Sequence, residues 1–239
     1  MQSRRLPGKV LMPLAGRPIL QFLLERIRFA KSLDQIVVAT GDMPANQPII
    51  ELSRLMGVNC IVGSEENVLD RFIYAAQKVK AEVIVRVTAD NPLTDPGAID
   101  ALVDKRTTTG ADLAVAHDLI DGAESEVMTF QALLRAQRTA TTVAHREHVT
   151  SVMKEHHSLF SIQTWLPPEE MRRPDLSVTI DTREDLIRIR SLCNNVAVHA
   201  GIQTWTGIVT WLNSYKRRHD GLDTWVRDLS GRIRKNDLE

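Results

Sequence analysis

The sequence is poor in the features that mark secreted, membrane-embedded or zinc-stapled proteins. It holds only two cysteines, Cys60 and Cys193, which lie in apolar surroundings and form no Cys-x-x-Cys pair. A disulfide framework and a cysteine-based zinc site are therefore not expected, and a reducing compartment fits this composition. No apolar run reaches the roughly 18 residues that a membrane-spanning helix requires. We therefore expect a cytoplasmic protein with no membrane partner.

Net charge is also absent, since 30 lysines and arginines balance 30 aspartates and glutamates. Proteins that coat nucleic acid normally carry a basic excess, so no nucleic-acid partner is expected. The balance is uneven along the chain, because residues 1–31 contain seven cationic side chains and a single acidic one, Glu25. A basic front on a neutral chain predicts a local anion-binding site.

The sequence does show the alternation of strand and helix patterns that is typical of an α/β protein. The 239 residues fit one domain, and a hydrophobic fraction of 43% is enough for a core. Short β-branched runs alternate with amphipathic helix patterns, which predicts a mostly parallel sheet with helices on both faces. The expected strands are residues 35–40, 58–62, 83–87 and 113–116, and the expected helices are residues 48–56, 67–80 and 98–108.

This alternation of strand and helix patterns is interrupted in the second half of the chain. We interpret residues 118–175 as an α+β lobe inserted into a sheet core made of residues 1–117 and 176–200. Residues 201–239 are expected to be C-terminal helices. The finer elements expected here are helices at 129–138 and 143–155, strands at 159–165 and 176–180, and a helix running from Asp181 or Thr182 to about residue 192.

The first segment with chemical potential runs from Ser3 to Lys9 and reads Ser-Arg-Arg-Leu-Pro-Gly-Lys. Guanidinium and ammonium groups offset phosphate charge, and a glycine lets backbone amides approach phosphate oxygens. The segment therefore fits a phosphate cradle. A solvated basic terminus explains the same residues equally well, so both interpretations stay open at this point.

Two acidic residues each follow an expected strand. Asp90 comes after strand 83–87, and Asp181 comes after strand 176–180. A carboxylate at the C-terminal end of a parallel strand is well placed to hold Mg²⁺ against a nucleotide phosphate. Each also has a structural explanation: Asp90 as a turn or cap residue, and Asp181 as a helix cap near a Thr182–Asp185 capping box. The two lie 91 residues apart and meet only if their strands are close neighbours.

Several short motifs occur in order over about residues 3–190. They are Arg5 to Leu11, Ile36 to Thr40, Gly63 to Glu65, Val68 to Arg71, Thr88 to Pro96, Gly122, Glu126-Val127, Arg146 to Thr150, and Val178 to Leu186. This ordered set resembles the cytidylyltransferases of the CMP-3-deoxy-manno-octulosonate synthetase and acylneuraminate cytidylyltransferase group. The resemblance is strongest to their spore coat polysaccharide biosynthesis protein F-like branch.

The resemblance implies a fold and a reaction. The fold is the Rossmann-like nucleotide-diphospho-sugar transferase fold, in a homodimer. The reaction transfers CMP from CTP to a hydroxyl of a sugar or 2-keto sugar acid, releases pyrophosphate, requires Mg²⁺, and serves surface polysaccharide or glycoconjugate synthesis. In-line attack of this kind depends mainly on positioning and electrostatics.

The resemblance also assigns residues to roles. It implies catalytic roles for Arg5, Lys9 and Asp90, and metal ligation by Asp90 and Asp181. Nucleotide binding is implied for Ser3, Arg4, Arg5, Gly8, Lys9, Asp70, Arg71 and Asp90, and substrate binding for Arg71, Arg86, Asn91, Arg146, Glu147 and His148. Structural alternatives stay open for some of them: an exposed helix pair for Asp70 and Arg71, a buried ion pair for Arg86, and a structural histidine for His148.

One family element has no counterpart in the sequence. The first hydrophobic strand of the family precedes the Arg-Leu-Pro-Gly-Lys segment, whereas here that segment begins at Arg5. We therefore expect a sheet that lacks one central parallel strand and has unpaired edges.

Two other functions stay open. The Pro-Leu-x-Gly-x-Pro segment at residues 13–18 also resembles sugar-phosphate and molybdopterin nucleotidyltransferases. A non-enzymatic, nucleotidyltransferase-like interaction protein is the third interpretation.

Overall fold

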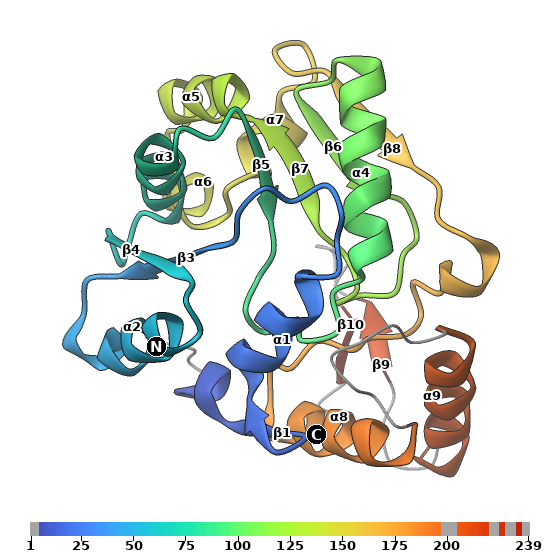
Figure 1. Ribbon diagram of the computed structural model, residues 1–239. Coiled ribbons are helices and arrows are strands. Elements are labelled where there is room, and N and C mark those ends of the chain that lie inside the picture. The colour runs from blue at the N-terminus through green and yellow to red at the C-terminus, as the bar shows by residue number, and fades with distance from the viewer. Residues whose placement is uncertain (1–4, 197–204, 220–224, 228–232, 236–239) are drawn as a thin grey trace.

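The computed structural model describes residues 5–196, 205–219, 225–227 and 233–235. These residues form an α/β structure in which helices cover both faces of short sheets (Figure 1). No helix among the described residues is long and apolar enough to cross a membrane.

The first half of the core is a parallel pair of strands. β3 (Val37–Gly41) pairs with β4 (Asn59–Gly63) in parallel register, from Val37 opposite Asn59 to Gly41 opposite Gly63. α2 (Gln47–Leu55) connects these strands, and α3 (Val68–Val79) follows β4. These elements agree with the expected strands and helices of residues 35–80 to within a few residues.

The second half is a four-stranded sheet with the order β5-β7-β6-β8. β7 runs antiparallel to both of its neighbours, and β6 and β8 run parallel to each other. α4 (Pro96–Thr109) covers one face of this sheet, as Figure 1 shows. The strands are β5 (Val83–Arg86), β6 (Leu113–Ala116), β7 (Glu126–Thr129) and β8 (Ile162–Trp165).

The sheet is interrupted between these halves. Among the described strands, β3 pairs only with β4, and β5 pairs only with β7, so each has one edge without a strand partner. The expected unpaired edges are therefore present. Apolar side chains of both edge strands, Val38 and Val85, pack on a shared cluster centred on α1 (Ile19–Ile27). Side-chain packing thus joins the halves where a backbone ladder does not.

The segment expected to form a lobe, residues 118–175, forms part of the four-stranded sheet. It contributes β7 and β8 as well as three helices, of which the first and the third pack with α3 around a second apolar cluster. The helix expected over 143–155 is broken in two, because the chain turns at His148 and Thr150. The helices are α5 (Phe130–Thr139), α6 (Val143–Glu147) and α7 (Ser151–Glu155), and a 3₁₀ turn follows β8 at η3 (Glu169–Met171).

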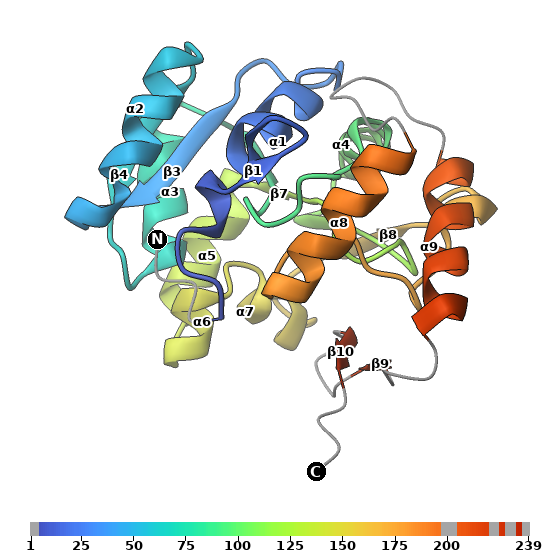
Figure 2. The same ribbon diagram turned by 90° about the horizontal axis from the view of Figure 1, so that it is seen from below.

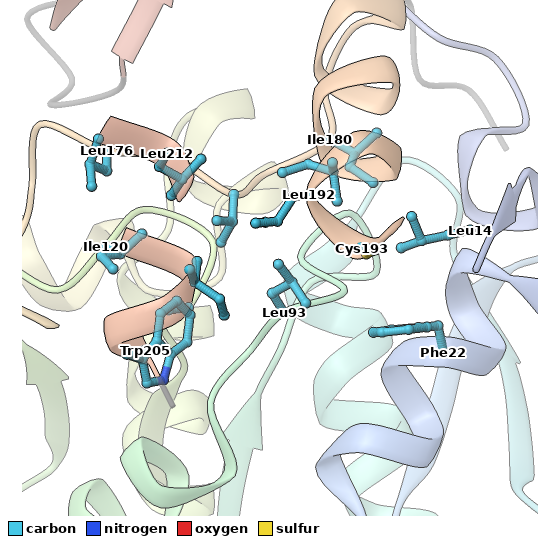
Figure 3. Close-up of a cluster of buried hydrophobic side chains, with 14 of the residues drawn as sticks. Leu14, Phe22, Leu93, Ile120, Leu176, Ile180, Leu192, Cys193, Trp205 and Leu212 are labelled. Atoms are coloured by element: carbon cyan, nitrogen blue, oxygen red, sulfur yellow. The ribbon is translucent and has the colours of Figure 1, made fainter. Parts of the chain in front are cut away.

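The largest apolar cluster lies under α8 (Arg183–Asn195) and α9 (Trp205–His219). Figure 3 shows side chains from α8, α9, α1 and the connecting loops converging there, including Phe22, Leu192 and Trp205. Seen from below in Figure 2, α1 lies between the β3–β4 side and the α8–α9 side. Trp205 is buried, as expected for a tryptophan that packs a terminal helix.

Short elements complete the N-terminal part. They are the 3₁₀ helices η1 (Lys9–Leu11) and η2 (Pro44–Asn46) and an antiparallel pair of two-residue strands, β1 (Pro13–Leu14) and β2 (Arg17–Pro18).

Two expected elements differ from the structure. Residues 176–180 form no regular strand, because their amides bond alternately to two different loops: Val178 to Asp121, and Ile180 to Asp90. A second C-terminal helix is also not formed in the described part of residues 220–239. Instead, β9 (Trp225–Arg227) and β10 (Ile233–Lys235) pair antiparallel.

Candidate active site

The basic segment enters the structure through a tight turn. Gly8 adopts a left-handed conformation with φ of 71°, which glycine reaches without steric cost, and η1 starts at the next residue. The turn directs Lys9 inward, so that only 7% of this residue is exposed. A solvated basic terminus is therefore excluded for Lys9. Arg5 keeps about half of its side chain exposed, at 45%.

Lys9 brings the two expected metal ligands together. Its Nζ donates to Asp90 Oδ2 at 2.8 Å, to Asp181 Oδ1 at 3.0 Å and to the Ile180 carbonyl at 2.8 Å. The second oxygen of Asp181, Oδ2, lies 2.7 Å from a guanidinium nitrogen of Arg5. Residues from three distant parts of the sequence thus meet at one point.

Local hydrogen bonds explain how Asp90 and Asp181 become neighbours. The amide of Ile180 donates to the carbonyl of Asp90 at 2.9 Å, which ties the segment before Asp181 to the loop after β5. The helix that follows is capped by Thr182 and Asp185, whose side chains form the predicted capping box. Because Asp185 supplies the capping carboxylate, that of Asp181 is left to face Lys9 and Arg5.

The electrostatics keep Asp90 ionised. Burial acts to raise the pKa of Asp90, but the charge of Lys9 and the hydrogen bonds from Lys9 and Thr88 outweigh it. The pKa of Asp90 therefore lies below its ordinary value. An ionised carboxylate is the form that binds a metal ion or an ammonium group.

The residues at this point fit a divalent cation of the Mg²⁺ or Mn²⁺ type. Two carboxylates and a main-chain carbonyl converge on one ammonium nitrogen, and oxygen donors are the ligands that hard cations prefer. No cluster of three or more His, Cys, Asp or Glu side chains suited to a metal occurs in the described part of the chain. A metal here would therefore take its remaining ligands from water or from a bound phosphate.

Asn91 adds a polar group beside Asp90. The residue is 8% exposed, and its side-chain oxygen Oδ1 is buried without a hydrogen-bond partner among the described residues. Buried polar atoms are almost always satisfied, so an orphaned one on the residue that follows Asp90 indicates a position for a ligand.

Asp70 and Arg71 lie elsewhere, at the start of α3, and form no exposed pair. Asp70 Oδ1 accepts from Gln137 of α5 and Oδ2 accepts from Asn67, both at 2.7 Å. Arg71 donates to the Ser64 carbonyl at 2.6 Å in the loop after β4. Burial lowers the pKa of Arg71, and the charge of Glu65 partly offsets this effect. Within the described residues, no hydrogen bond or ion pair joins this pair to Asp90.

Arg86 is part of an ion-pair network. Its NH1 donates to Glu126 Oε2 at 2.8 Å, and Glu126 also accepts from Lys154 at 2.6 Å and from Thr150 at 2.9 Å. Burial raises the pKa of Glu126, but Arg86 and Lys154 more than compensate, so that this pKa is lowered. Arg86 thus forms an ion pair within the structure, and its role in substrate binding stays a prediction.

These partners of Arg86 are not among the predicted site residues. A glutamate inside the apolar stretch of residues 126–128 was the available signal, because a charge in a buried strand needs a partner.

Glu124 was also missed. It lies two residues before Glu126 and makes no ion pair within the described part of the chain. Although solvent reaches the residue, protein atoms crowd its carboxyl. This desolvation, with the charges of Asp121 and Glu126, raises the pKa of Glu124 to about 7. The carboxyl is therefore half protonated near neutral pH.

The other predicted site residues do not contact Lys9, Asp90 or Asp181 within the described part of the chain. Arg146, Glu147 and His148 are exposed on and after α6, where their side chains make no hydrogen bond to another described residue. The buried histidine of this helix is His145, which caps α6 and pairs with Glu155 at 2.8 Å. Ser3 and Arg4 lie outside the described residues.

Comparison with known proteins places this geometry in a family. The family model for cytidylyltransferases matches residues 1–204. The chain belongs to the cytidylyltransferase family. It is 34% identical over 218 residues to the spore coat polysaccharide biosynthesis protein SpsF of Bacillus subtilis, covering 89% of this chain and 90% of SpsF. It is 43% identical over 183 residues to an uncharacterised protein of Methanocaldococcus jannaschii, covering 77% of this chain and 75% of that protein.

Solved structures agree with the family. A cytidylyltransferase from Leptospira borgpetersenii superposes with a TM-score of 0.78 at 25% identity, over 91% of this chain and 90% of that one. A CMP:2-keto-3-deoxy-manno-octonic acid synthetase solved with CTP shares the fold, with a TM-score of 0.61 at 16% identity over 80% of this chain and 93% of that one. The expected Rossmann-like nucleotidyltransferase fold is confirmed, and the protein is a nucleotidyltransferase.

Proposed function

We propose that the protein transfers CMP from CTP to a hydroxyl of a sugar or 2-keto sugar acid, with Mg²⁺ as the cofactor, in surface polysaccharide or glycoconjugate synthesis. One observation carries this proposal: Lys9 and Arg5 converge on Asp90 and Asp181. Cationic groups for a polyphosphate and oxygen donors for a metal are the two requirements of nucleotidyl transfer, and they meet at one point. The similarity to SpsF supports the choice of pathway.

Each side chain has a role in this reaction. The acceptor hydroxyl oxygen forms a bond to the α-phosphorus and loses its proton to water, while the bond from that phosphorus to the bridging oxygen breaks and pyrophosphate leaves with the electron pair. Arg5 and Lys9 would stabilise the charge that develops on pyrophosphate, and the turn at Gly8 would let backbone amides approach its oxygens. Asp90 and Asp181 would hold Mg²⁺, which when bound offsets the charge of the α-phosphate.

The orphaned Oδ1 of Asn91 would accept a hydrogen bond from the acceptor or the ribose. Both carboxylate oxygens of Asp70 already accept hydrogen bonds, from Asn67 and from Gln137 of α5. Of this pair we therefore assign only Arg71 to the nucleotide. Asp70 would then position α3. Arg86 would support the acceptor side through Glu126, and Arg146, Glu147 and His148 would reach an acceptor from the exposed surface of α6.

The protein is expected to act as a homodimer. Large apolar side chains are exposed on the part of the chain expected to form the lobe, namely Val143 at 74%, Leu159 at 52% and Leu166 at 59%. A contiguous exposed apolar patch marks an interface, and a patch built from these three side chains would serve the homodimer. Sedimentation equilibrium of the chain and of Val143→Glu tests this arrangement, and a monomeric parent chain would contradict it.

The activity is tested by pyrophosphate release with CTP, UTP, ATP and GTP in turn. The acceptors are 3-deoxy-manno-octulosonate, N-acetylneuraminate and neutral hexoses, with and without Mg²⁺. We expect turnover with CTP alone, and a loss of at least about 100-fold in Asp90→Asn and in Asp181→Asn. Preference for GTP or UTP would favour the molybdopterin or sugar-phosphate alternative. Retained Mg²⁺-dependent activity in Asp90→Asn would overturn the metal assignment, and absence of stabilisation by any nucleotide would favour the non-enzymatic alternative.

A further inference from the structure

Lys9 uses its whole hydrogen-bonding capacity within the site. An ammonium group has three N–H donors, and the three of Lys9 meet Asp90, Asp181 and the carbonyl of Ile180 at 2.8–3.0 Å. Two carboxylates and one carbonyl are also a typical oxygen set for a hard divalent cation. The ammonium and such a cation would therefore use the same atoms.

The charges of the site determine whether a divalent cation can bind there alone. Two carboxylates that point at one position need a cation between them, and Lys9, with 7% of its surface exposed, provides it at the centre. Arg5 neutralises the outer oxygen of Asp181 at 2.7 Å. The two cations and two carboxylates balance, so a divalent cation that joins them without a further anion creates an excess of positive charge in a partly buried site.

A polyphosphate resolves this excess. It gives Lys9 and Arg5 new anionic partners, and the four-carbon stem of a lysine can re-aim its charge without a main-chain movement. We propose that Lys9 is an internal competitor of the divalent cation: its ammonium holds the Asp90–Asp181 pair until a nucleotide draws it away, so that metal binding depends on nucleotide binding. This inference rests on the proposed function for the identity of the metal pair, and it adds an order of binding to it.

The test measures Mn²⁺ binding in the absence of nucleotide, by electron paramagnetic resonance of free Mn²⁺. We expect weak binding to the parent chain and binding at least about 10-fold tighter to Lys9→Met, because removing the ammonium frees both carboxylates. Lys9→Arg keeps the charge and is expected to bind as weakly as the parent. Lys31→Met removes one exposed positive charge far along the chain from Lys9, and it controls for the change in net charge.

The same gain is expected in Lys9→Gln, which replaces Lys9→Met if the latter does not fold. Adding Asp90→Asn to either variant should abolish the gain, which locates the binding at this pair. Equal or weaker Mn²⁺ binding by Lys9→Met and Lys9→Gln would overturn the inference. If the parent chain then still transfers CMP, only the competition fails; if Mn²⁺ binding tightens but no nucleotide is turned over, the proposed function fails and the competition holds.

Discussion

Arg86 donates to Glu126 at 2.8 Å from the register position directly opposite it, at the end of β5 and the start of β7. Both side chains are mostly buried, at 22% and 13% exposure. Lys154 of α7 adds a second cation to the same carboxylate. One glutamate therefore compensates two positive charges and joins a helix to the sheet.

The first prediction concerns that glutamate. Glu126→Gln keeps the shape of the side chain but removes its charge, which leaves Arg86 and Lys154 without a compensating anion. Breaking a buried ion pair on one side costs about 3–5 kcal/mol, and we expect the lower part of that range because Lys154 is half exposed at 50%. Urea-induced unfolding measures the free-energy change.

The matched control is Glu82→Gln, next to the start of β5, where the residue is exposed. A change within about 0.5 kcal/mol is expected there, as for most surface substitutions. Equal effects of the two substitutions would show that the Glu126 network contributes nothing to stability.

The second prediction concerns a close approach at Gly122. Its φ is +89°, and a Cβ at this position would lie 2.6 Å from the amide nitrogen of Thr179 and 2.7 Å from its hydroxyl oxygen. Gly122→Ala must therefore push away the segment that carries Asp181. We expect a loss of more than about 2 kcal/mol in unfolding free energy, together with loss of nucleotidyl transfer.

Gly57→Ala separates the backbone strain from the clash. Gly57 also has a positive φ, +65°, but nothing lies within 4 Å of the position of its Cβ. Only the left-handed strain of about 1–2 kcal/mol applies there, and activity should persist. Identical losses in both variants would mean that the contact with Thr179 is unimportant.

The third prediction concerns pH. The pKa of Glu124 is raised from 4.5 to about 7 in the folded chain. As the pH rises between these values, the unfolded chain releases this proton while the folded chain keeps it, so the stability due to Glu124 falls across that window. Glu124→Gln removes this loss. The melting temperature of the variant should exceed that of the parent by an amount that grows from pH 4.5 to pH 7 and then levels off.

Differential scanning calorimetry over that pH range measures the difference. Glu124→Asp keeps a carboxyl at the position and serves as the control, because it should retain the pH dependence. A difference between Glu124→Gln and the parent that is the same at every pH would contradict the raised pKa.

The fourth prediction concerns the interrupted sheet. β7 is hydrogen-bonded on both sides, whereas β3 and β5 are each bonded on one side among the described strands. Amides of Val127 and Met128 should therefore exchange with deuterium more slowly than those of β3 and β5, half of whose amides should exchange at least about 100-fold faster. Mass-spectrometric hydrogen exchange measures this, and uniform protection across the three strands would contradict the interruption.

Local patterns were sufficient to predict most of the fold. Strands β3, β4 and β6 and helices α3 and α8 follow from β-branched runs, amphipathic spacing and the Thr182–Asp185 capping box. Residues 176–180 were predicted as a strand because their composition suits one. Their conformation is decided instead by the two loops whose carbonyls accept hydrogen bonds from their amides, and such distant partners are not encoded locally.

The candidate site likewise has residues that the sequence predicts and contacts that it does not predict. Lys9, Asp90 and Asp181 are predicted from the basic segment, the two strand-end acids and the family-like order of their motifs. No sequence pattern shows that one ammonium bridges both acids, because 172 residues separate Lys9 from Asp181. Glu126 belongs to one of the motifs but has no predicted role, because its partners Lys154 and Thr150 reach it from a different element. Long-range charge compensation is a property of the packed chain.

The interruption between β3 and β5 also governs how stiff the active site is. Backbone ladders resist sliding of one strand along another, whereas apolar contacts resist it weakly. Arg71 lies on α3, which follows β4, and Asp90 follows β5. The two sides are connected by side-chain packing on α1, by the packing of α3 in the second apolar cluster and by the Asp70–Gln137 bond of 2.7 Å. The span from Arg71 to Asp90 therefore rests on side-chain packing, to which the leucines of α1 (Leu20, Leu23 and Leu24) contribute.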